Sequence, residues 1–545
     1  MDSREKIGRN ELCPCDSGHK FKHCHGLLLD HSSGSSNTTL SRSRLEASEY
    51  IRRQQQGSGR PIIALNASDQ QIVVVGNRIY SSDKWLTFID FLEDYVKQLL
   101  GPDWGNSEMR KPYGERHTLL QWYETKGLQQ QASRDSIGAV KTMSPTGASA
   151  AYYSLAYGLY LLAHNVELQA KLLNRIRDPR NFQGAYYEVL IANILIRAGF
   201  ELVLEDEDDR TSKHCEFAAI SKQTGERYWI EAKMKAVDGL LGKTSNDGSA
   251  DPNPTSHLIR HITGALAKPA DAKRLIFIDM NAEFPADLKE SELPNFFKSA
   301  ERRLIKFEQS NESQGFEAYV FLTNLTFHRR LDDHPTMLVM PFGLNKPDFN
   351  RPRVMSVSDA YKLELKHVEA LNITNAFGQL LVLPATFNGE LPAEVFNGAR
   401  APVKLGQSYC FEGIGVEGGV TGAVTTATVV ESEKAAYIGI RTSDGRSMIL
   451  KESMSDAQLI DYRAHGDAYF GEVGPVPQGI ETPLKYFKFL MNAYSKSPRE
   501  TLIGLMAGRI SGSALAAMSD EDLRITYCEG MTSAKFPQSS RKVPI

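Results

Sequence analysis

Two residues of opposite charge, Glu231 and Lys233, stand two positions apart in the segment Arg227-Tyr-Trp-Ile-Glu-Ala-Lys233. Residues two apart in a β-strand project from the same face, so this carboxylate and this ammonium should lie side by side. The alternate residues should face a core: Tyr228, Ile230 and Ala232. A carboxylate beside an ammonium can hold Mg²⁺ and position a water molecule against a phosphodiester. The segment therefore predicts metal-dependent phosphodiester hydrolysis.

The neighbouring segments predict elements that could position this pair. Apolar residues at helical spacing predict a helix that carries Glu188 and ends at Gly199. Strands are expected at 200–204, 215–220 and 227–233, then a helix near 256–267 and a strand at 274–280. The predicted order is αβββαβ, and residues 317–323 should add a further strand to the same sheet.

This order and these residues resemble the PD-(D/E)xK nuclease superfamily, which has the restriction-endonuclease-like fold. The resemblance covers roughly residues 181–280, the length of a small domain. It implies that Glu188 is the acid of the first helix, that Glu216 stands at the Asp of the family's Pro-Asp, and that Glu231 and Lys233 complete the set. It also implies that the three glutamates bind catalytic Mg²⁺, with Mn²⁺ as a substitute, while the lysine orients the attacking water or steadies charge on the phosphate. Glu216 is one methylene longer than the usual Asp, and Mg²⁺ geometry is strict.

A structural interpretation stands beside the catalytic one. The acid-x-Lys spacing also occurs at Glu124, Asp271 and Glu364, so the spacing alone is weak. Glu188 could be a solvated carboxylate on a helix face, and Glu231 with Lys233 could be a surface ion pair on an edge strand. Four matching residues in one αβββαβ frame favour the nuclease site.

The amino terminus carries a second set of reactive residues, with Cys13, Cys15, Cys24 and His25 in a Cys-x-Cys…Cys-His arrangement. Four such ligands suit tetrahedral Zn²⁺ and leave no position open for a substrate, so the zinc would be structural. A disulfide pair or free thiols are the alternatives. The other cysteines are scattered and the chain does not begin like a secretory signal, which disfavours a disulfide framework.

The same segment closely resembles the SEC-C motif, with Asp16 where that motif usually has Gly. The resemblance implies that Cys13, Cys15, Cys24 and His25 bind the zinc, which leaves His19 and His23 as spare histidines. It also implies a protein or ribosome partner for this module.

Length and composition limit the remaining possibilities. The 545 residues predict about three or four domains. With 41% hydrophobic and 24% charged residues, the composition is typical of a soluble globular protein. No apolar run approaches the ~20 residues of a membrane span, so we expect a cytoplasmic protein with no membrane partner. The net charge of −3 gives no overall attraction to nucleic acid, so binding would require a local basic surface.

We therefore expect a multidomain α/β protein with a restriction-endonuclease-like core, an amino-terminal zinc module and a carboxy-terminal β-rich and helical part. The predicted divisions are a zinc module (1–30), a linker and helix (31–60), a mainly helical domain (61–178), a nuclease-like domain (179–350), a β-rich domain (351–480) and carboxy-terminal helices (481–545). One aromatic stripe of the helical domain is expected to be core: Trp85, Phe88, Phe91, Leu92, Tyr95 and Leu99. Capping boxes are expected at Ser455 and Ser497.

Two classes of function fit these observations. The first is a Mg²⁺-dependent nuclease that acts on DNA rather than RNA, and the resemblance implies a role in antiviral defence against foreign nucleic acid. The second is a non-catalytic factor that binds nucleic acid or protein through a nuclease-like scaffold and a zinc module. Lys233 beside Glu231 favours the first class, because a scaffold has no need of that lysine.

Overall fold

The computed structural model describes most of the chain after the amino-terminal segment. The described residues are 52–53, 55–132, 144–204, 217–237, 239, 241–242, 253–268, 273–285, 292–311, 315–350, 354–387, 403–406, 408–411, 420–442, 445–470, 482–536 and 543–544. The predicted zinc ligands and Glu216 lie outside these residues, as do the predicted linker 31–39 and most of the helix predicted after it.

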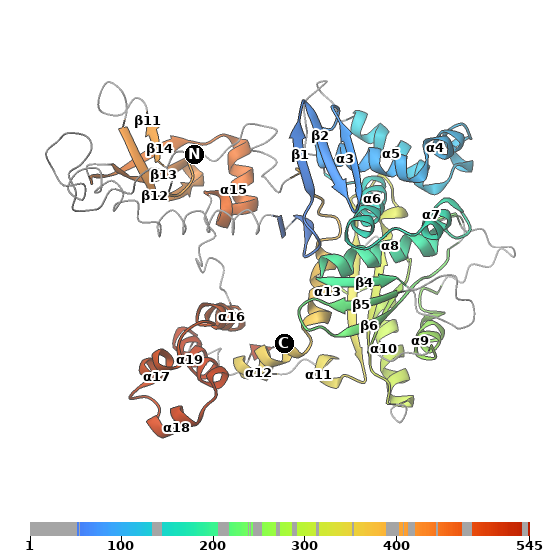
Figure 1. Cartoon of the computed structure of the whole chain (residues 1–545). Helices are drawn as coiled ribbons and strands as arrows, with labels where there is room; N and C mark the ends of the chain where they lie inside the picture. Colours follow the sequence, from blue (N-terminus) through green and yellow to red (C-terminus); the bar gives the residue numbers. More distant parts are fainter. Residues whose placement is uncertain are drawn as a thin grey trace, which may run out of the picture. The chain divides into compact units, whose positions relative to one another are not determined.

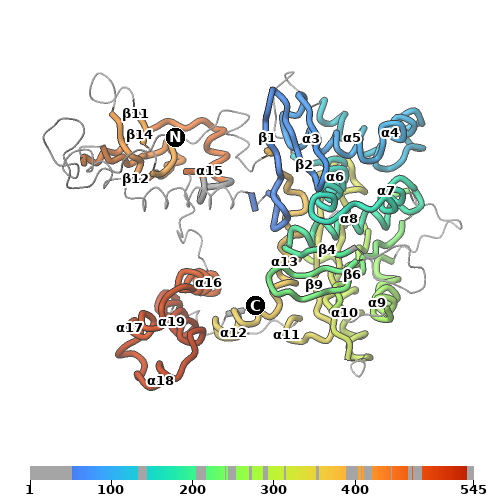
Figure 2. Tube along the Cα trace, viewed as in Figure 1, coloured from blue at the N-terminus to red at the C-terminus, as the bar shows by residue number. Residues whose placement is uncertain are grey.

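The chain divides into two compact units. The larger unit comprises Arg52–Asn388 and Pro477–Ile545, and the smaller one contains Gly389–Val476. The smaller unit holds an antiparallel sheet in the order β11-β12-β13-β14, which Figure 2 traces in orange. Its elements are β11 (Ser408–Phe411), β12 (Val420–Val430), β13 (Ala435–Thr442), β14 (Ser447–Ser453) and α15 (Asp456–Tyr469). This antiparallel sheet confirms the β-rich part that the sequence predicts.

The larger unit is built around a mixed six-stranded sheet in the order β4-β5-β6-β7-β8-β9 (Figure 1). Its strands are β4 (Phe200–Leu204), β5 (Phe217–Ser221), β6 (Arg227–Met234), β7 (Lys273–Asp279), β8 (Ala318–Leu325) and β9 (Met337–Leu344). Strand β7 runs parallel to both β6 and β8, and the other neighbours pair antiparallel. With α8 (Phe182–Arg197) before β4 and α9 (Leu258–Leu266) before β7, the order αβββαβ is confirmed, and so is the further strand β8.

Helices cover both faces of this sheet. On one face, Ile230 of β6 shares a hydrophobic core with Ile191 of α8 and Ile373 of α13 (Val368–Gly378). On the opposite face, Ile276 of β7 packs with Ile262 of α9 and with the helix α10 (Asn295–Ser310). Because side chains alternate along a strand, β7 and β8 contribute buried side chains to both cores, whereas β4, β5 and β6 contribute theirs to the first core. Parallel strands are usually covered on both faces in this way.

The segment before α8 packs into the same core as the sheet. Its elements are β1 (Ile63–Ala67), β2 (Gln70–Val75), β3 (Arg78–Ser82), α3 (Phe88–Leu100), α4 (Pro102–Met109), α5 (Thr118–Ala132), α6 (Gly147–Asn165) and α7 (Ala170–Arg177). The predicted aromatic stripe is confirmed as core, since five of its six side chains are buried and Leu99 packs against them. The predicted division at residues 178–179 falls between α7 and α8, which belong to this one core.

The carboxy-terminal part of the larger unit is helical. Its elements are α11 (Pro347–Asn350), β10 (Val354–Met355), α12 (Val357–Lys366), α16 (Pro483–Ala493), α17 (Arg499–Met506), α18 (Gly512–Ala517), α19 (Asp520–Lys535) and β15 (Val543–Pro544). Val357 of α12 packs with Phe487 of α16 and Cys528 of α19, and β15 pairs with β10. Among the helices that the structure describes, none is both long enough and apolar enough to cross a membrane.

A close helix contact joins the amino-terminal helices to the sheet. Gly158 of α6 lies against Val189 of α8, and a Cβ at Gly158 would come within 2.6 Å of the Val189 Cγ1. Gly127 of α5 has open space at the corresponding position, with no atom within 4 Å. The two glycines thus differ in packing although both lie inside helices.

We predict that Gly158→Ala destabilises the larger unit by about 1–3 kcal/mol, because the added methyl group overpacks the α6–α8 contact. Gly127→Ala is the matched control and should stabilise by about 0.5–1 kcal/mol through helix propensity alone. All four tryptophans lie in this unit, so urea unfolding followed by tryptophan fluorescence measures both effects. Equal unfolding midpoints for the two variants would contradict the assigned contact.

Candidate functional site

Glu231 is a buried carboxylate near the middle of the six-stranded sheet. Its strand β6 lies between β5 and β7, and Glu231 is 4% exposed. Tyr228, Ile230 and Ala232 point into the core shared with α8, as predicted. Glu231 pairs in register with Ile276, whose side chain faces α9 and α10. The alternative of a surface ion pair on an edge strand is therefore wrong, because Glu231 is buried and β6 is an interior strand.

Two lysines hold the Glu231 carboxylate. The Lys233 Nζ lies 3.1 Å from the Glu231 Oε1, and the Lys268 Nζ lies 2.6 Å from the Oε2. The predicted adjacency of Glu231 and Lys233 is thus confirmed, while Lys268 is a residue that the sequence interpretation missed. Lys268 follows the end of α9, and its side chain is largely buried. Two ammonium groups therefore lie against a single carboxylate.

Helix α9 also brings a histidine to the site. Burial lowers the pKa of His261 to about 4, and the nearby cations Arg260 and Lys233 act in the same direction, as does His257. The rings of His257 and His261 are 6.2 Å apart. His257 is the N-cap of α9 and Lys268 follows its C-cap, and their spacings of four and seven residues from His261 correspond in the sequence to one side of a helical pattern. That spacing is the signal that could have identified the additional residues.

Glu188 occupies a different environment from Glu231. Its carboxylate accepts hydrogen bonds from both terminal guanidinium nitrogens of Arg175 in α7, with Nη1 2.9 Å from Oε2. Helix α8, which carries Glu188, covers the sheet face opposite to the one toward which Glu231 points. Glu188 therefore contributes to an ion pair between α7 and α8. Its predicted role as a metal ligand stays a prediction.

Few side chains that could bind a metal ion lie close together in the described part of the chain. No group of three or more His, Cys, Asp and Glu side chains there is arranged to hold a metal ion. Mg²⁺ is commonly held by only one or two carboxylates and takes its other ligands from water and phosphate. Glu231 can supply one such carboxylate. The second predicted ligand, Glu216, lies outside the described residues.

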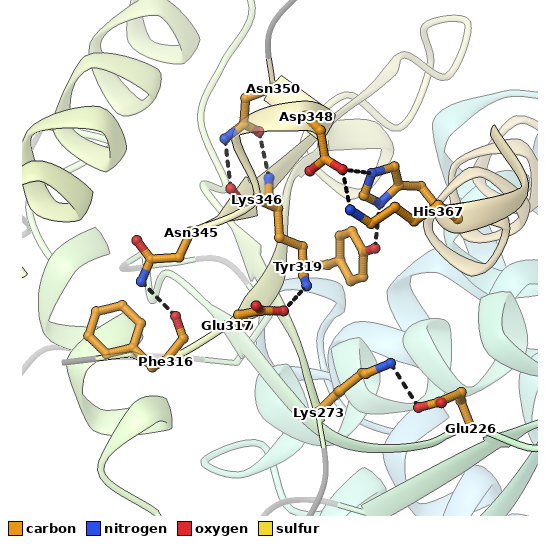
Figure 3. A network of polar contacts seen from close by, with 12 residues as sticks. Glu226, Lys273, Phe316, Glu317, Tyr319, Asn345, Lys346, Asp348, Asn350 and His367 are labelled. Carbon is orange, nitrogen blue, oxygen red and sulfur yellow. Dashed lines mark hydrogen bonds and ion pairs between the residues drawn. The ribbon is translucent and has the colours of Figure 1, made fainter. Parts of the chain in front are cut away.

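A second charged cluster lies at the amino ends of β7 and β8 (Figure 3). The Tyr319 hydroxyl lies 2.7 Å from the His367 Nδ1, and the His367 Nε2 lies 3.4 Å from the Asp348 Oδ2. Three lysines are each paired with one carboxylate, and these pairs are Lys273–Glu226, Lys346–Glu317 and Lys366–Asp348. These ion pairs link β8 to α11 and to the end of α12. Because every lysine has an acidic partner, the cluster is better suited to structural support than to anion binding.

A third polar cluster is fully buried at the carboxyl ends of β7 and β8. The Asp279 carboxylate accepts hydrogen bonds from the Thr323 hydroxyl and from the backbone N–H groups of Asn281 and Leu325. The His328 Nε2 lies 3.0 Å from the Asn281 Oδ1. Burial raises the pKa of Asp279 to about 6 and lowers the pKa of His328 to about 3. These groups are held by the fold and are closed to a substrate.

Comparison with known proteins identifies only the amino-terminal motif. The SEC-C motif matches residues 9–27, which confirms that predicted resemblance. The segment is 60% identical over 30 residues to the protein translocase subunit SecA of Bartonella bacilliformis, and 78% identical over 23 residues to that of Orientia tsutsugamushi. These matches cover 6% and 4% of this chain and 3% of each relative, so the chain spans a very small part of the curated relatives. No solved structure matches the chain.

The buried His328 leads to a prediction about acid stability. The unfolded chain takes up a proton at histidine near pH 6.5, but folded His328 does so only near pH 3, so the unfolded state binds more protons between these values. Stability from neutral His328 is therefore lost as the pH falls below 6.5. Asp279 has a raised pKa, so between about pH 6 and 4 the folded state binds more protons at this residue than the unfolded state does. Its contribution to stability therefore increases as the pH falls, opposite to that of His328.

When the pH falls from 7 to 5, the unsubstituted protein should lose about 2 kcal/mol more free energy of unfolding than His328→Gln, because the variant lacks the buried histidine. Urea unfolding at the two pH values measures this difference. His334→Gln, at an exposed histidine, is the matched control and should show the wild-type pH dependence. If the stability of His328→Gln depended on pH as the control's does, the pKa of His328 would be the same in the folded and unfolded states, and the prediction would be wrong.

Proposed function

We propose that the central part of the chain is a Mg²⁺-dependent nuclease of the PD-(D/E)xK type, with Mn²⁺ as a substitute, that cleaves DNA rather than RNA. The observation that supports the proposal best is the buried Glu231 with Lys233 at 3.1 Å on the same strand face. The order αβββαβ around this pair agrees with it. The ammonium groups of Lys233 and Lys268 favour the approach of a phosphate.

The proposal assigns a role to each residue of the site. Glu231, together with Glu216, would hold the metal ion, which when bound would polarise the scissile phosphate. Lys233 orients the attacking water or steadies negative charge on the phosphate, since its ammonium is the more exposed of the two. Lys268, whose side chain is largely buried, holds the other oxygen of the Glu231 carboxylate and so fixes its position. Hydrogen bonds to charged groups are strong enough to fix such an orientation.

The zinc module is proposed to act separately from the nuclease site. Zinc held by Cys13, Cys15, Cys24 and His25 would have no open coordination position, so it would not activate water. A protein or ribosome partner would contact this module and bring the nuclease to its target. We propose a cytoplasmic role in defence against foreign nucleic acid, in agreement with the nuclease assignment.

A second candidate is a non-catalytic factor that binds nucleic acid or protein. The pairing of Glu188 with Arg175 favours it, because a carboxylate held by a guanidinium is less available to a metal ion. In this case the positive charge at Lys233 and Lys268 would serve to bind phosphate without cleavage.

The nuclease proposal predicts that Lys233→Ala and Glu231→Gln reduce Mg²⁺-dependent cleavage by about 10²–10³-fold, since each removes a group that acts on the reacting phosphate. Glutamine is chosen because it keeps a hydrogen-bond acceptor at the buried position, whereas an apolar residue would remove both oxygens that the lysines contact. The assay follows labelled double-stranded DNA and RNA, with Mg²⁺ and without it. Lys273→Ala, on the neighbouring strand β7, removes a lysine from another ion pair and should keep full activity.

Three outcomes separate the candidates. Cleavage that depends on Lys233 and Glu231 but not on Lys273 supports the nuclease. Equal cleavage by all proteins would show that the activity arises elsewhere. No cleavage by the wild type, with DNA binding that Lys233→Ala weakens, would establish the non-catalytic candidate.

The zinc proposal predicts one tightly bound zinc ion per chain, and its loss in Cys13→Ser and His25→Asn. His23→Asn is the matched control, because this neighbouring histidine is not a proposed ligand and its loss should leave the zinc content unchanged. Elemental analysis of the purified proteins measures the stoichiometry. The absence of zinc from the wild type, or a disulfide between Cys13 and Cys15 found by mass spectrometry, would contradict the proposal.

A further inference from the structure

A cavity of about 550 Å³ lies between the β2–β3 hairpin and the helices α3, α6 and α7. These elements are in the amino-terminal part of the larger unit (Figure 1). The cavity is of the size that small-molecule ligands occupy, about 300–1,000 Å³. The residues around Glu231 do not contribute to its lining. Its function is therefore independent of the proposed nuclease.

Fixed backbone contacts hold the walls of this cavity in place. Gly76, in the turn between β2 and β3, has a φ of +57°, and a Cβ there would meet the Ala163 carbonyl oxygen of α6 at 2.7 Å. The turn therefore lies directly on the end of α6. On the other side, the Arg60 N–H donates to the Asn165 Oδ1 at 2.7 Å, and the Arg60 Nη1 donates to the His164 carbonyl at 3.2 Å. The cavity is formed before any ligand arrives.

The rim of the cavity is positively charged. Arg60 and Arg78 line it, and Glu167 is the single acidic residue in the lining, so the net charge is +1. Arg60 has a structural role as well, since it binds a carbonyl at the carboxyl end of α6. Arg78 has no such role, because no hydrogen bond or ion pair of its side chain is found within the described part of the chain. An arginine in this position is suited to bidentate recognition of a phosphate or carboxylate.

The floor of the cavity is aromatic and apolar. The rings of Tyr80 and Tyr95 contact each other edge to face, with centroids 5.4 Å apart, and Leu173 of α7 lies in the same lining. Burial raises the pKa of Tyr95, and the neighbouring Tyr80 adds to this effect while Arg78 opposes it. Arg78 and Tyr95 both line the cavity. A ligand that contacts both would carry an anionic group next to a flat apolar body.

We propose that this cavity binds a nucleoside monophosphate, with the phosphate on Arg78 and Arg60 and the base against Tyr80, the less buried of the two tyrosines. Phosphate alone would leave the aromatic floor unfilled. A nucleoside alone would leave Arg78 without a partner. The amide of Asn77 on the rim offers both a donor and an acceptor to the base edge. Aromatic side chains bind bases by stacking, and arginines bind the phosphate with hydrogen bonds to a charged group.

Isothermal titration of the full chain with AMP and UMP tests the proposal, with adenosine and inorganic phosphate as the two partial ligands. Arg78→Gln should weaken nucleotide binding roughly tenfold to hundredfold, the range expected for a lost charged hydrogen bond. Leu173→Trp should also weaken it by filling the cavity. Arg110→Gln, at an exposed arginine of the same unit outside the lining, is the matched control.

Saturable binding of AMP or UMP that Arg78→Gln and Leu173→Trp weaken, and Arg110→Gln does not, supports the proposal. Three results would overturn it: no binding of either nucleotide, equal affinity in Arg78→Gln and the wild type, or phosphate or adenosine binding as tightly as AMP. None of these results depends on whether the chain cleaves nucleic acid, so the nuclease proposal stands or falls separately.

Discussion

Burial of the six-stranded sheet on both faces is the constraint from which the candidate site follows. Strands β7 and β8 bury apolar side chains on both faces and need helices on each side, and α9 covers the face toward which Glu231 points. A single buried carboxylate would cost several kcal/mol in lost hydration. The two lysines at 3.1 and 2.6 Å offset that cost, and in doing so they fix the orientation of the carboxylate. The same packing that stabilises the fold therefore assembles a charged group with fixed geometry.

The elements of the fold were predictable where the pattern is local. Helical spacing in α8 and alternation in β6 gave their positions within a few residues, and the reciprocal hydrogen bonds of Ser455 and Gln458 confirm one capping box. The other capping box is wrong, because α17 begins after Pro498 with no side-chain cap. Strand β9 was missed, and its Pro341 argues against a strand in sequence terms. The proline is tolerated because β9 is at the edge of the sheet.

The site was only partly predictable because its contacts depend on tertiary packing. The spacing of Glu231 and Lys233 specifies their shared face without reference to the rest of the chain. The polar face of β6 suggested exposure to water, which is normal for an antiparallel sheet but not for strands covered by a crossover helix. Lys268 reaches Glu231 only because α9 packs on that face. Likewise, the pairing of Glu188 with Arg175 follows from the packing of α7 on α8.

The balance of charge distinguishes the two lysine-rich clusters of the larger unit. At the amino ends of β7 and β8, Lys273, Lys346 and Lys366 are each matched by a carboxylate, and Glu369 adds a further negative charge to the same cavity. A phosphate approaching this cluster would meet a net negative charge before it displaced any ion pair. At Glu231, two lysines share one carboxylate, so a phosphate would meet two ammonium groups there. Electrostatics therefore favours the Glu231 site over the other cluster for a phosphodiester, although both contain the same residue types.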